Sequence, residues 1–568
     1  MTLESRKKWI VPEKISNASS IVDDILLKRG ILDHSQSFLN PSLNDIPSWE
    51  KLHGTKKAAE EILEAIKNGD RIFIHGDFDV DGICATAILW EFLYFELAKH
   101  LNVKVDVLPY IPDRIDEGYG LSKSSVDSML GNAAKLIITV DCGVRDRKLI
   151  EEYMDDSSCK FIITDHHQPP EDIKTVKYTL VHQMFPGKEY PEQKVCGAFV
   201  SFMLTNAIRE LIGMQSSITI QSPGLDLVAL ATVTDMMPLI GVNRAVVKYG
   251  IEQMKKGGRV GMNSLLDISG VDPSSLDSYH LGFVIGPRIN AAGRIGSAME
   301  ALKLLVNRDA RKASALASGL QNLNALRQEK TSEVLSHADS LVVVEDPVIF
   351  VYSDGWHEGV IGLVAGKLLE KYGKPVVLAT QTEEGAWKGS ARSVETFNIT
   401  NAIASASDHL ERYGGHAQAA GFTVKSDQIE QFKEKLLKFA HDNIGVDVIE
   451  RTLDLDAQIE PLSVDSHLFE AIETLKPFGY GNSKPLMYIA DAEIIDIMLM
   501  KQGEHMKLKI NNGGKGTTAL MFNCKDDSEQ FKVGDRVDLA AYISLNEWNG
   551  YRNIELQVKE WRRPDLHQ

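Results

Sequence analysis

Three aspartates crowd one short turn of the sequence. Asp77, Asp79 and Asp81 alternate within His75-Gly-Asp-Phe-Asp-Val-Asp-Gly82, after an apolar run and before a stretch of small and apolar residues. This order predicts a buried strand, a tight turn that carries the acids, and a helix. Carboxylates this close repel one another, and a bound cation would neutralise that repulsion. We therefore expect a site for a hard divalent metal ion at this turn.

Residue types that bind metals also follow two later apolar runs. Residues 135–140 end in Asp141, and residues 160–164 end in Asp165-His166-His167, while Asp235 closes an apolar helical segment where an unpaired carboxylate is costly to bury. Taken singly, such an aspartate is more often a helix N-cap or turn residue, and a histidine pair is usually a surface or satisfied core pair. Their joint occurrence favours a metal site. Carboxylates and imidazoles without a thiolate suit Mn²⁺ or Mg²⁺ better than structural zinc.

The elements that must position these residues alternate between strand and helix. Helical segments separate five apolar runs, at residues 71–74, 103–110, 135–140, 161–164 and 178–182. This alternation predicts a mostly parallel sheet with helices on both faces. Ligands of such sheets bind beyond the carboxyl ends of the strands, which is where the acids fall.

The rest of the chain divides around this sheet. We expect an N-terminal arm over residues 1–50 packed on the main α/β domain, which covers residues 51–308. We expect a long connector helix over residues 309–343 and a smaller α/β domain over residues 344–447. Beyond residue 448, short apolar runs broken by turn signals predict a small β-barrel, with the oligonucleotide-binding fold as the leading candidate.

Length and composition exclude several classes of protein. A chain of 568 residues exceeds what one hydrophobic core usually supports. No apolar run is long enough to span a membrane, and we expect a cytoplasmic protein. Five scattered cysteines do not fit a disulfide framework or a zinc finger. The net charge of -17 argues against a generally basic nucleic-acid coat but leaves room for a local basic groove.

Four motifs resemble those of the DHH phosphoesterase superfamily, in the same order along the chain. They are His75-Gly-Asp-Phe-Asp-Val-Asp-Gly82, Thr139-Val-Asp-Cys-Gly143, Asp165-His-His167 and Val233-Thr-Asp-Met-Met-Pro238. The chain is further similar to one branch of this superfamily, the bacterial single-strand-specific exonucleases. That similarity rests on Gly286-Pro-Arg-Ile-Asn-Ala-Ala-Gly-Arg294, Gly414-Gly-His-Ala-Gln-Ala-Ala-Gly421 and Leu475-Lys-Pro-Phe-Gly-Tyr-Gly-Asn-Ser-Lys-Pro485.

The resemblance implies a fold and a metal centre. The fold would have a DHH lobe and a smaller DHHA1-type lobe facing a cleft, joined by the long helix, plus the barrel. Asp77 and Asp165 would sit against the metal cluster in catalytic roles, and His75 would add a ligand or a supporting contact. Two ions, Mn²⁺ or Mg²⁺, would activate a shared water and clamp a phosphodiester. Their ligands would be Asp79, Asp81, Asp141, His166, His167 and Asp235.

The resemblance also implies substrate contacts, which are Arg114, Arg288, Asn290, Arg294, Ser390, Arg392, Gly414 and Gly415. Arg114, Ser390 and Arg392 match a pocket for a terminal 5′ phosphate, and arginine suits bidentate phosphate contacts. Taken alone, each of these three is a polar loop residue. Residues 286–294 also have a purely structural alternative, in which they start a helix and their arginines are solvated.

His416 follows the glycine pair of the smaller lobe. The resemblance implies that His416 donates a hydrogen bond to an oxygen of the scissile phosphate. The structural alternative is that Gly414 and Gly415 end a helix over residues 402–413, because helices commonly end at glycine.

Together these implications describe a metal-dependent 5′-to-3′ exonuclease that hydrolyses single-stranded DNA to mononucleotides in DNA repair and recombination. One alternative is a DHH-family phosphoesterase for short oligoribonucleotides or cyclic dinucleotides, which would need neither the barrel nor the phosphate pocket. Another is a non-catalytic replication scaffold, which would be expected to have lost metal ligands. For partners we expect single-stranded DNA with a 5′ end, no membrane and a monomer. A helicase and a single-stranded-DNA-binding protein are candidate protein partners that the sequence does not identify.

Overall fold

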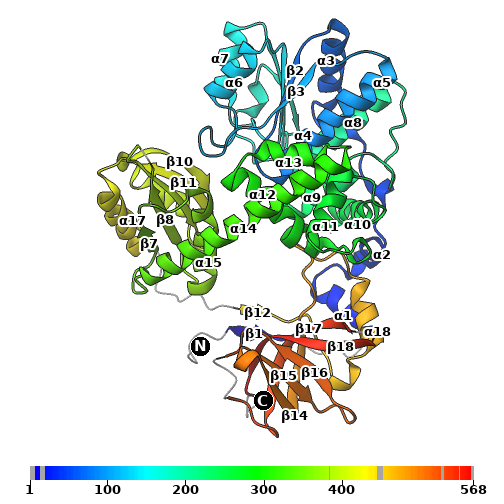
Figure 1. Ribbon diagram of the computed structural model, residues 1–568, viewed down its shortest axis with the longest axis vertical. Coiled ribbons are helices and arrows are strands. Elements are labelled where there is room, and N and C mark those ends of the chain that lie inside the picture. Colours follow the sequence, from blue (N-terminus) through cyan, green and yellow to red (C-terminus); the bar gives the residue numbers. More distant parts are fainter. Residues whose placement is uncertain are drawn as a thin grey trace. The chain divides into compact units, whose positions relative to one another are not determined.

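The computed structural model describes residues 7–12, 20–382, 384–443, 452–525, 530–548 and 551–564. The chain forms two compact units (Figure 1). The larger unit comprises residues 47–237 and 249–449, and the smaller comprises residues 1–46, 238–248 and 450–568. All five cysteines are buried. No helix of the described residues has both the length and the apolar character to cross a bilayer.

A five-stranded parallel sheet lies at the centre of the larger unit, in the order β3-β2-β4-β5-β6. The strands are β2 (Ile72–His75), β3 (Val107–Tyr110), β4 (Leu136–Val140), β5 (Lys160–Asp165) and β6 (Thr179–His182). Helices α6 (Lys123–Gly131) and α7 (Arg147–Asp156) cover one face, and the other carries α3 (Thr55–Asn68), α4 (Val80–Glu91) and α8 (Gly197–Leu211) (Figure 1). Because both faces are covered, β2 and β4 are buried along their whole length. The predicted, mostly parallel sheet is confirmed.

A helical layer follows this sheet in the chain. Its helices are α9 (Leu225–Thr234), α10 (Gly241–Lys255), α11 (Val260–Ile268), the π-helical turn η8 (His280–Ile285), α12 (Gly286–Ile295) and α13 (Ala298–Leu305). The 31-residue helix α14 (Ala310–Ser340) then leads to the second sheet (Figure 1). Asp309 caps α14 by accepting hydrogen bonds from the backbone N–H groups of Arg311 and Lys312.

The second sheet is mixed, in the order β10-β11-β9-β8-β7. Its strands are β7 (Ile349–Tyr352), β8 (Val376–Gln381), β9 (Trp387–Arg392), β10 (Leu410–His416) and β11 (Ala419–Val424), with helices α15 (Glu358–Tyr372), α16 (Ile399–Ala404) and α17 (Ile429–Asn443). Only β7 and β8 are parallel. The alternative of a helix over residues 402–413 is wrong, because residues 410–416 form β10. Gly415 has φ +150°, and a Cβ there would lie 2.3 Å from the carbonyl oxygen of Ala419 in the paired strand.

The smaller unit contains a closed β-barrel, consistent with the predicted oligonucleotide-binding fold. The strands run in the order β13-β14-β15-β16-β18-β17, and β17 pairs back with β14. Their bounds are Ala457–Gln458 for β13, Met487–Met500 for β14, His505–Ile510 for β15, Thr517–Met521 for β16, Arg536–Trp548 for β17 and Tyr551–Arg562 for β18. Helix α18 (Ser466–Glu473) and the parallel pair β1 (Lys8–Ile10) and β12 (Thr452–Asp454) complete the unit.

Residues 1–46 of the N-terminal arm belong to the barrel unit and only residues 47–50 to the larger unit, so the prediction that the arm packs on the main domain is wrong for residues 1–46. Ile25 and Leu26 of α1 (Ile21–Lys28) are fully buried and, with Phe38, share one core with the barrel strands. Arg244, which is 1% exposed, donates to the carbonyl oxygens of Phe38 (2.5 Å) and Lys476 (2.6 Å). The amphipathic helix therefore buries its apolar side in the barrel core, and this packing cannot be derived from its periodicity.

Candidate active site

The acid turn lies at the carboxyl end of β2. Asp79 caps α4, because its Oδ1 accepts hydrogen bonds from the backbone N–H groups of Asp81 (2.9 Å) and Gly82 (3.1 Å). Asp77 and Asp81 are buried, with exposed fractions of 4% and 2%. The strand–turn–helix order that the sequence predicts therefore places three carboxylates at one buried edge of the sheet.

Asp81 is held by the first residues of α8. Its two carboxylate oxygens accept hydrogen bonds from the backbone N–H groups of Gly197 (2.6 Å) and Ala198 (2.7 Å). The positive end of the helix dipole favours a carboxylate at this position. A Cβ on Gly197 would lie 2.6 Å from Cβ of Asp141, so only glycine lets α8 approach so closely.

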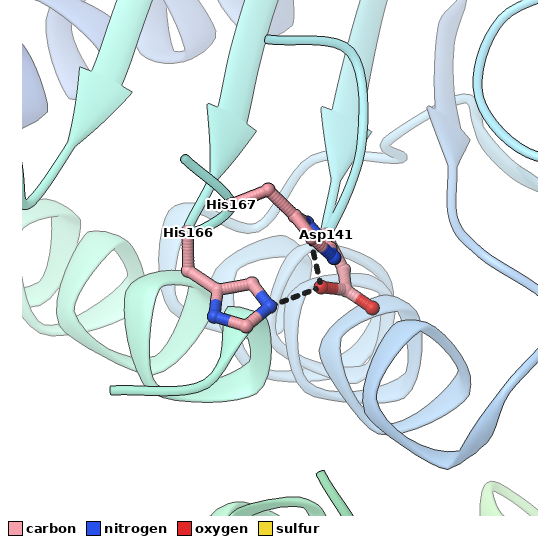
Figure 2. A group of neighbouring side chains, drawn as sticks. All are labelled: Asp141, His166 and His167. Carbon is pink, nitrogen blue, oxygen red and sulfur yellow. Dashed lines mark ion pairs between the residues drawn. The ribbon is translucent and has the colours of Figure 1, made fainter. Parts of the chain in front are cut away.

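Asp141 and the histidine pair converge from neighbouring strand ends. Asp141 follows β4 with φ +63°, while His166 and His167 follow β5. Figure 2 shows both imidazoles next to the Asp141 carboxylate. Nε2 of His166 lies 3.1 Å from Oδ1 of Asp141, and Nδ1 of His167 lies 4.0 Å from the same oxygen (Figure 2). Asp235, at the end of α9, brings Oδ2 to 3.6 Å from Nε2 of His166.

Asp165 orients the two histidines. Its Oδ1 accepts hydrogen bonds from the backbone N–H groups of His166 (2.7 Å) and His167 (3.0 Å) and lies 2.8 Å from Nδ1 of His167. Its Oδ2 accepts from the backbone N–H of Val144 (3.0 Å). Burial alone would raise the pKa of Asp165, but the hydrogen bond and charge of His167 lower it. An ionised Asp165 places the His167 proton on Nδ1, which leaves Nε2 without a proton and able to bind a metal ion.

Among the residues that the structure describes, the cluster has an excess of acceptors and too few hydrogen-bond donors to match them. Ligand atoms lie within 4.8 Å of one another in three groups: Asp141, His166 and His167; Asp81, His166 and Asp235; and Asp77, Asp79 and Asp141. All six residues predicted as ligands are therefore brought together, and Asp77 lies equally close. Five buried atoms here have no hydrogen-bond partner among the described residues: Nε2 of His75 and His166, Oδ1 of Asp77 and Asp141, and Oδ2 of Asp235.

Electrostatics lead to the same conclusion about the cluster. Burial, followed by the charges of the neighbouring aspartates, raises the pKa values of Asp77, Asp141 and Asp235 well above the usual value for a carboxyl group. Burial lowers the pKa of His75 to about 4 and also lowers that of His166, so both imidazoles are neutral near pH 7 and free to act as ligands. Crowded carboxylates with neutral imidazoles fit divalent cations such as Mn²⁺ or Mg²⁺.

Four arginines, Arg114, Arg294, Arg327 and Arg392, gather beside this cluster, and the last two come from α14 and from β9 of the smaller lobe. Burial, then the charges of Arg114, Arg327 and Arg392, lowers the pKa of Arg294 to about 9. The Arg114 guanidinium lies 4.7 Å from the ring centroid of Phe78 within the acid turn. Nη1 of Arg392 donates to Oγ of Ser390 (3.2 Å), and Nη1 of Arg294 to the carbonyl oxygen of Gly359 (3.4 Å). No described carboxylate lies within 4 Å of any of the four guanidinium groups, so their charges are available to an anion.

Helix α12 supports the acid turn. Oδ1 of Asn290 accepts a hydrogen bond from the backbone N–H of Val80 (3.2 Å), the first residue of α4. Arg288 donates to Oε1 of Gln321 (2.8 Å) and to the carbonyl oxygen of Val284 (2.6 Å). Residues 286–295 are helical, as the structural alternative assumed. Arg288 and Arg294, however, are partly buried and make hydrogen bonds rather than being simply solvated.

The glycine pair and His416 lie on the β10–β11 hairpin. Burial lowers the pKa of His416, and the charges of Arg145 and His167 lower it further, so the hairpin lies within electrostatic range of the metal-ligand residues. A Cβ on Gly414 would have no described neighbour within 4 Å, which leaves the backbone there open to a ligand.

Two residues near the site were not identified from the sequence. The Tyr119 hydroxyl lies 3.0 Å from Nδ1 of His167 and donates to the carbonyl oxygen of Asp141 (3.3 Å). Its signal is an aromatic residue between two glycines with positive φ, Gly118 and Gly120, just after Arg114. Arg327 has a buried Nε without a partner in the described part of the chain, and the helical pattern of α14 offers no signal for it.

Three family models match the chain: the DHH family, N-terminal domain, over residues 71–232; the DHHA1 domain over residues 345–442; and the RecJ OB domain over residues 455–560. The single-stranded-DNA-specific exonuclease RecJ of Bacillus subtilis is 32% identical over 96% of this chain and 69% of its own length. The protein of the same name from Thermus thermophilus is 33% identical over 93% of this chain and 73% of its own length.

A solved structure agrees with these sequence relatives. The crystal structure of RecJ in complex with Mn²⁺ from Thermus thermophilus matches with a TM-score of 0.81 and 29% identity, over 98% of this chain and 80% of that one. The complex of the same protein with Mg²⁺ matches with a TM-score of 0.75 and 28% identity, over 99% and 79% of the two chains. On this identity and coverage, the chain belongs to the RecJ family of single-stranded-DNA-specific exonucleases.

Proposed function

We propose that this chain is a metal-dependent exonuclease that hydrolyses single-stranded DNA from the 5′ end to mononucleotides, in DNA repair and recombination. The observation that carries the proposal is the set of five buried carboxylate and imidazole atoms without hydrogen-bond partners among the described residues, grouped at the carboxyl ends of β2, β4 and β5 and of α9. Its family membership supplies the substrate class, since its relatives are single-stranded-DNA-specific exonucleases.

Two Mn²⁺ or Mg²⁺ ions would be held by Asp79, Asp81, Asp141, His166, His167 and Asp235. When bound, such ions lower the pKa of a water and stabilise the negative charge that develops on a phosphodiester. Asp141 belongs to two of the three ligand groups and is the proposed bridging carboxylate. Asp165 keeps Nε2 of His167 free to bind a metal ion. Asp77 and His75 add further buried polar atoms beside these ligands.

The arginine cluster accounts for the proposed direction of degradation, from the 5′ end. Arg114, Arg392 and Ser390 would bind the terminal 5′ phosphate, because guanidinium groups without a carboxylate partner at a partly buried site gain more from a phosphate than from water. Arg288, Asn290 and Arg294, with the open backbone at Gly414 and Gly415, would hold the next phosphates. His416 would donate a hydrogen bond to an oxygen of the scissile phosphate.

We propose the domain organisation to match. Residues 51–308 form the DHH catalytic domain and residues 309–343 the connector helix. Residues 344–447 form the DHHA1-type substrate-binding domain and residues 448–568 the oligonucleotide-binding domain, with residues 1–50 as the N-terminal arm. The protein would act in the cytoplasm as a monomer, with a helicase or a single-stranded-DNA-binding protein as the partner that supplies the strand.

The test compares the protein with an Asp141→Ala variant in the presence of Mn²⁺. The substrates are end-labelled single-stranded DNA with a 5′ phosphate, the same sequence as a duplex, and a dinucleotide. We expect wild-type protein to shorten only the single strand from its 5′ end, and the variant to be at least about a thousandfold slower, since metal contacts supply several kcal/mol. Cleavage of the dinucleotide alone, absence of all hydrolysis, or full activity of the variant would each contradict the proposal.

A further inference from the structure

Two aromatic side chains stand exposed on the helical turn before α12. Tyr279 and Phe283 are 61% and 72% exposed. Their rings stack on each other, with centroids 5.1 Å apart and planes inclined by 24°. They bracket the start of the π-helical turn η8, and such turns are frequent at functional sites. Because both side chains are more than half exposed, the pair is an apolar surface available to a ligand.

The turn that carries this aromatic pair packs on the residues that precede the metal-ligand residue Asp235. A Cβ on Gly286 would lie 2.5 Å from Cγ2 of Thr234, and one on Gly282 would lie 3.3 Å from Cγ1 of Val233. The turn therefore packs on the last residues of α9, directly before Asp235. The same continuous helix reaches the acid turn at Asn290. Asn290 lies seven positions after Phe283, which is about 10 Å of helix, or about three nucleotides of stacked DNA.

The chemistry of the surroundings selects the ligand. Arg288 follows within the same helix, and Arg294 lies one to two turns beyond it, so cationic groups that suit a phosphate backbone accompany the flat apolar rings. Every nucleobase offers an aromatic face, and base stacking on exposed aromatic side chains does not depend on sequence. In a duplex the internal base faces are already stacked, so only a single strand can offer them here.

We propose that Tyr279 and Phe283 form a stacking platform for unpaired bases of the DNA strand that passes the metal centre. This inference rests on the proposed function and deepens it, because it assigns part of the selectivity for single strands to a surface outside the metal and phosphate sites. Both side chains are more than half exposed, so their removal leaves the hydrophobic core intact.

The test measures binding by fluorescence anisotropy in an Asp141→Ala background, which prevents hydrolysis. A Tyr279→Ala/Phe283→Ala variant is compared with a Tyr94→Ala control in the same unit, where Tyr94 is 45% exposed and stacks on Trp90 at 4.7 Å. Two oligonucleotides are used, one ordinary and one with abasic sites along its first six or so nucleotides. We expect the double variant to bind the ordinary strand at least about tenfold more weakly and the abasic strand as the control does.

The outcomes separate this inference from the proposed function. Equal affinity of the double variant and the control for the ordinary strand would overturn the platform, as would an equal loss for both oligonucleotides. Hydrolysis of single-stranded DNA is measured separately with the wild-type protein, in which Asp141 is intact. Absence of hydrolysis would contradict the proposed function and would leave the interpretation of the binding comparison unchanged.

Discussion

Replacing Asp165 with asparagine tests how the metal-ligand histidines are oriented. The buried carboxylate takes part in four contacts, three at Oδ1 and one at Oδ2. In its better orientation the amide keeps the three at Oδ1, but its NH₂ group then faces the N–H of Val144. The Val144 N–H and the new amide N–H then both lack an acceptor, and each buried donor left unpaired costs about 1–3 kcal/mol of stability. The loss of negative charge beside Nδ1 of His167 makes Nε2 a poorer ligand, and such changes cost about 10- to 100-fold in metal affinity.

The assay is calorimetric titration of the metal-free protein with Mn²⁺, together with urea unfolding. A matched control is Asp226→Asn, which alters another buried carboxylate, one that accepts a hydrogen bond from Arg259 (2.7 Å) at the far end of α9. We expect both variants to be destabilised but only Asp165→Asn to lose Mn²⁺ affinity. Unchanged affinity in Asp165→Asn, or the same loss in both variants, would refute the orienting role.

Three further predictions concern the rest of the site. Because the pKa values of Asp77, Asp141 and Asp235 are raised, the folded metal-free protein keeps protons that the unfolded chain has lost, and its stability falls as pH rises from about 4 through these raised values. Since Mn²⁺ displaces these protons, the increase in Tm that it causes should be larger at about pH 8 than at about pH 5. An increase in Tm that does not change with pH would argue against these carboxylates as ligands. Arg392→Ala should reduce the preference for a 5′-phosphorylated over a 5′-hydroxyl strand by about tenfold or more, as measured by kcat/KM on the two substrates, and an unaltered preference would place the terminal phosphate elsewhere. Gly293→Ala should lower activity and stability, because its Cβ would lie 2.5 Å from the carbonyl oxygen of Phe78. The control Gly319→Ala on α14, whose Cβ meets no described atom within 4 Å, should stabilise the protein by about 1 kcal/mol. Equal effects of the two substitutions on urea unfolding would contradict the close approach of Gly293 to Phe78.

The parallel sheet and its acid turn could be predicted because their signals are local. Apolar runs that end in Asp141 or in Asp165-His166-His167 indicate strand ends, and parallel strands bring these ends to one edge. The hairpin at Gly414 and Gly415 was harder to interpret. A glycine pair after a helix-like run fits a helix end as well as a strand, and only the pairing of β10 with β11, which is not local, decides between them.

The parts of the site that escaped prediction depend on contacts between distant segments. Asp81 was predicted as a ligand, but the two N–H groups that hold it, at the start of α8 and more than a hundred residues later in the chain, were not. Tyr119 contacts His167 through a loop whose path the sequence does not specify. Arg327 looks like any exposed residue of a long charged helix until Arg288 and Arg294 are placed beside it.

The N-terminal arm has a consequence for how the chain folds as the ribosome makes it. Ile25, Leu26 and Phe38 complete the barrel core, but Trp561 of the same core is synthesised roughly 500 residues later, which takes about 25 to 100 s at the usual rate of translation. Through that interval these apolar side chains lack their native partners and are suitable targets for a chaperone. The larger unit, whose last residue precedes the barrel strands, can assemble its metal-ligand residues first. The barrel can close its core only after its last strand, β18, has been synthesised.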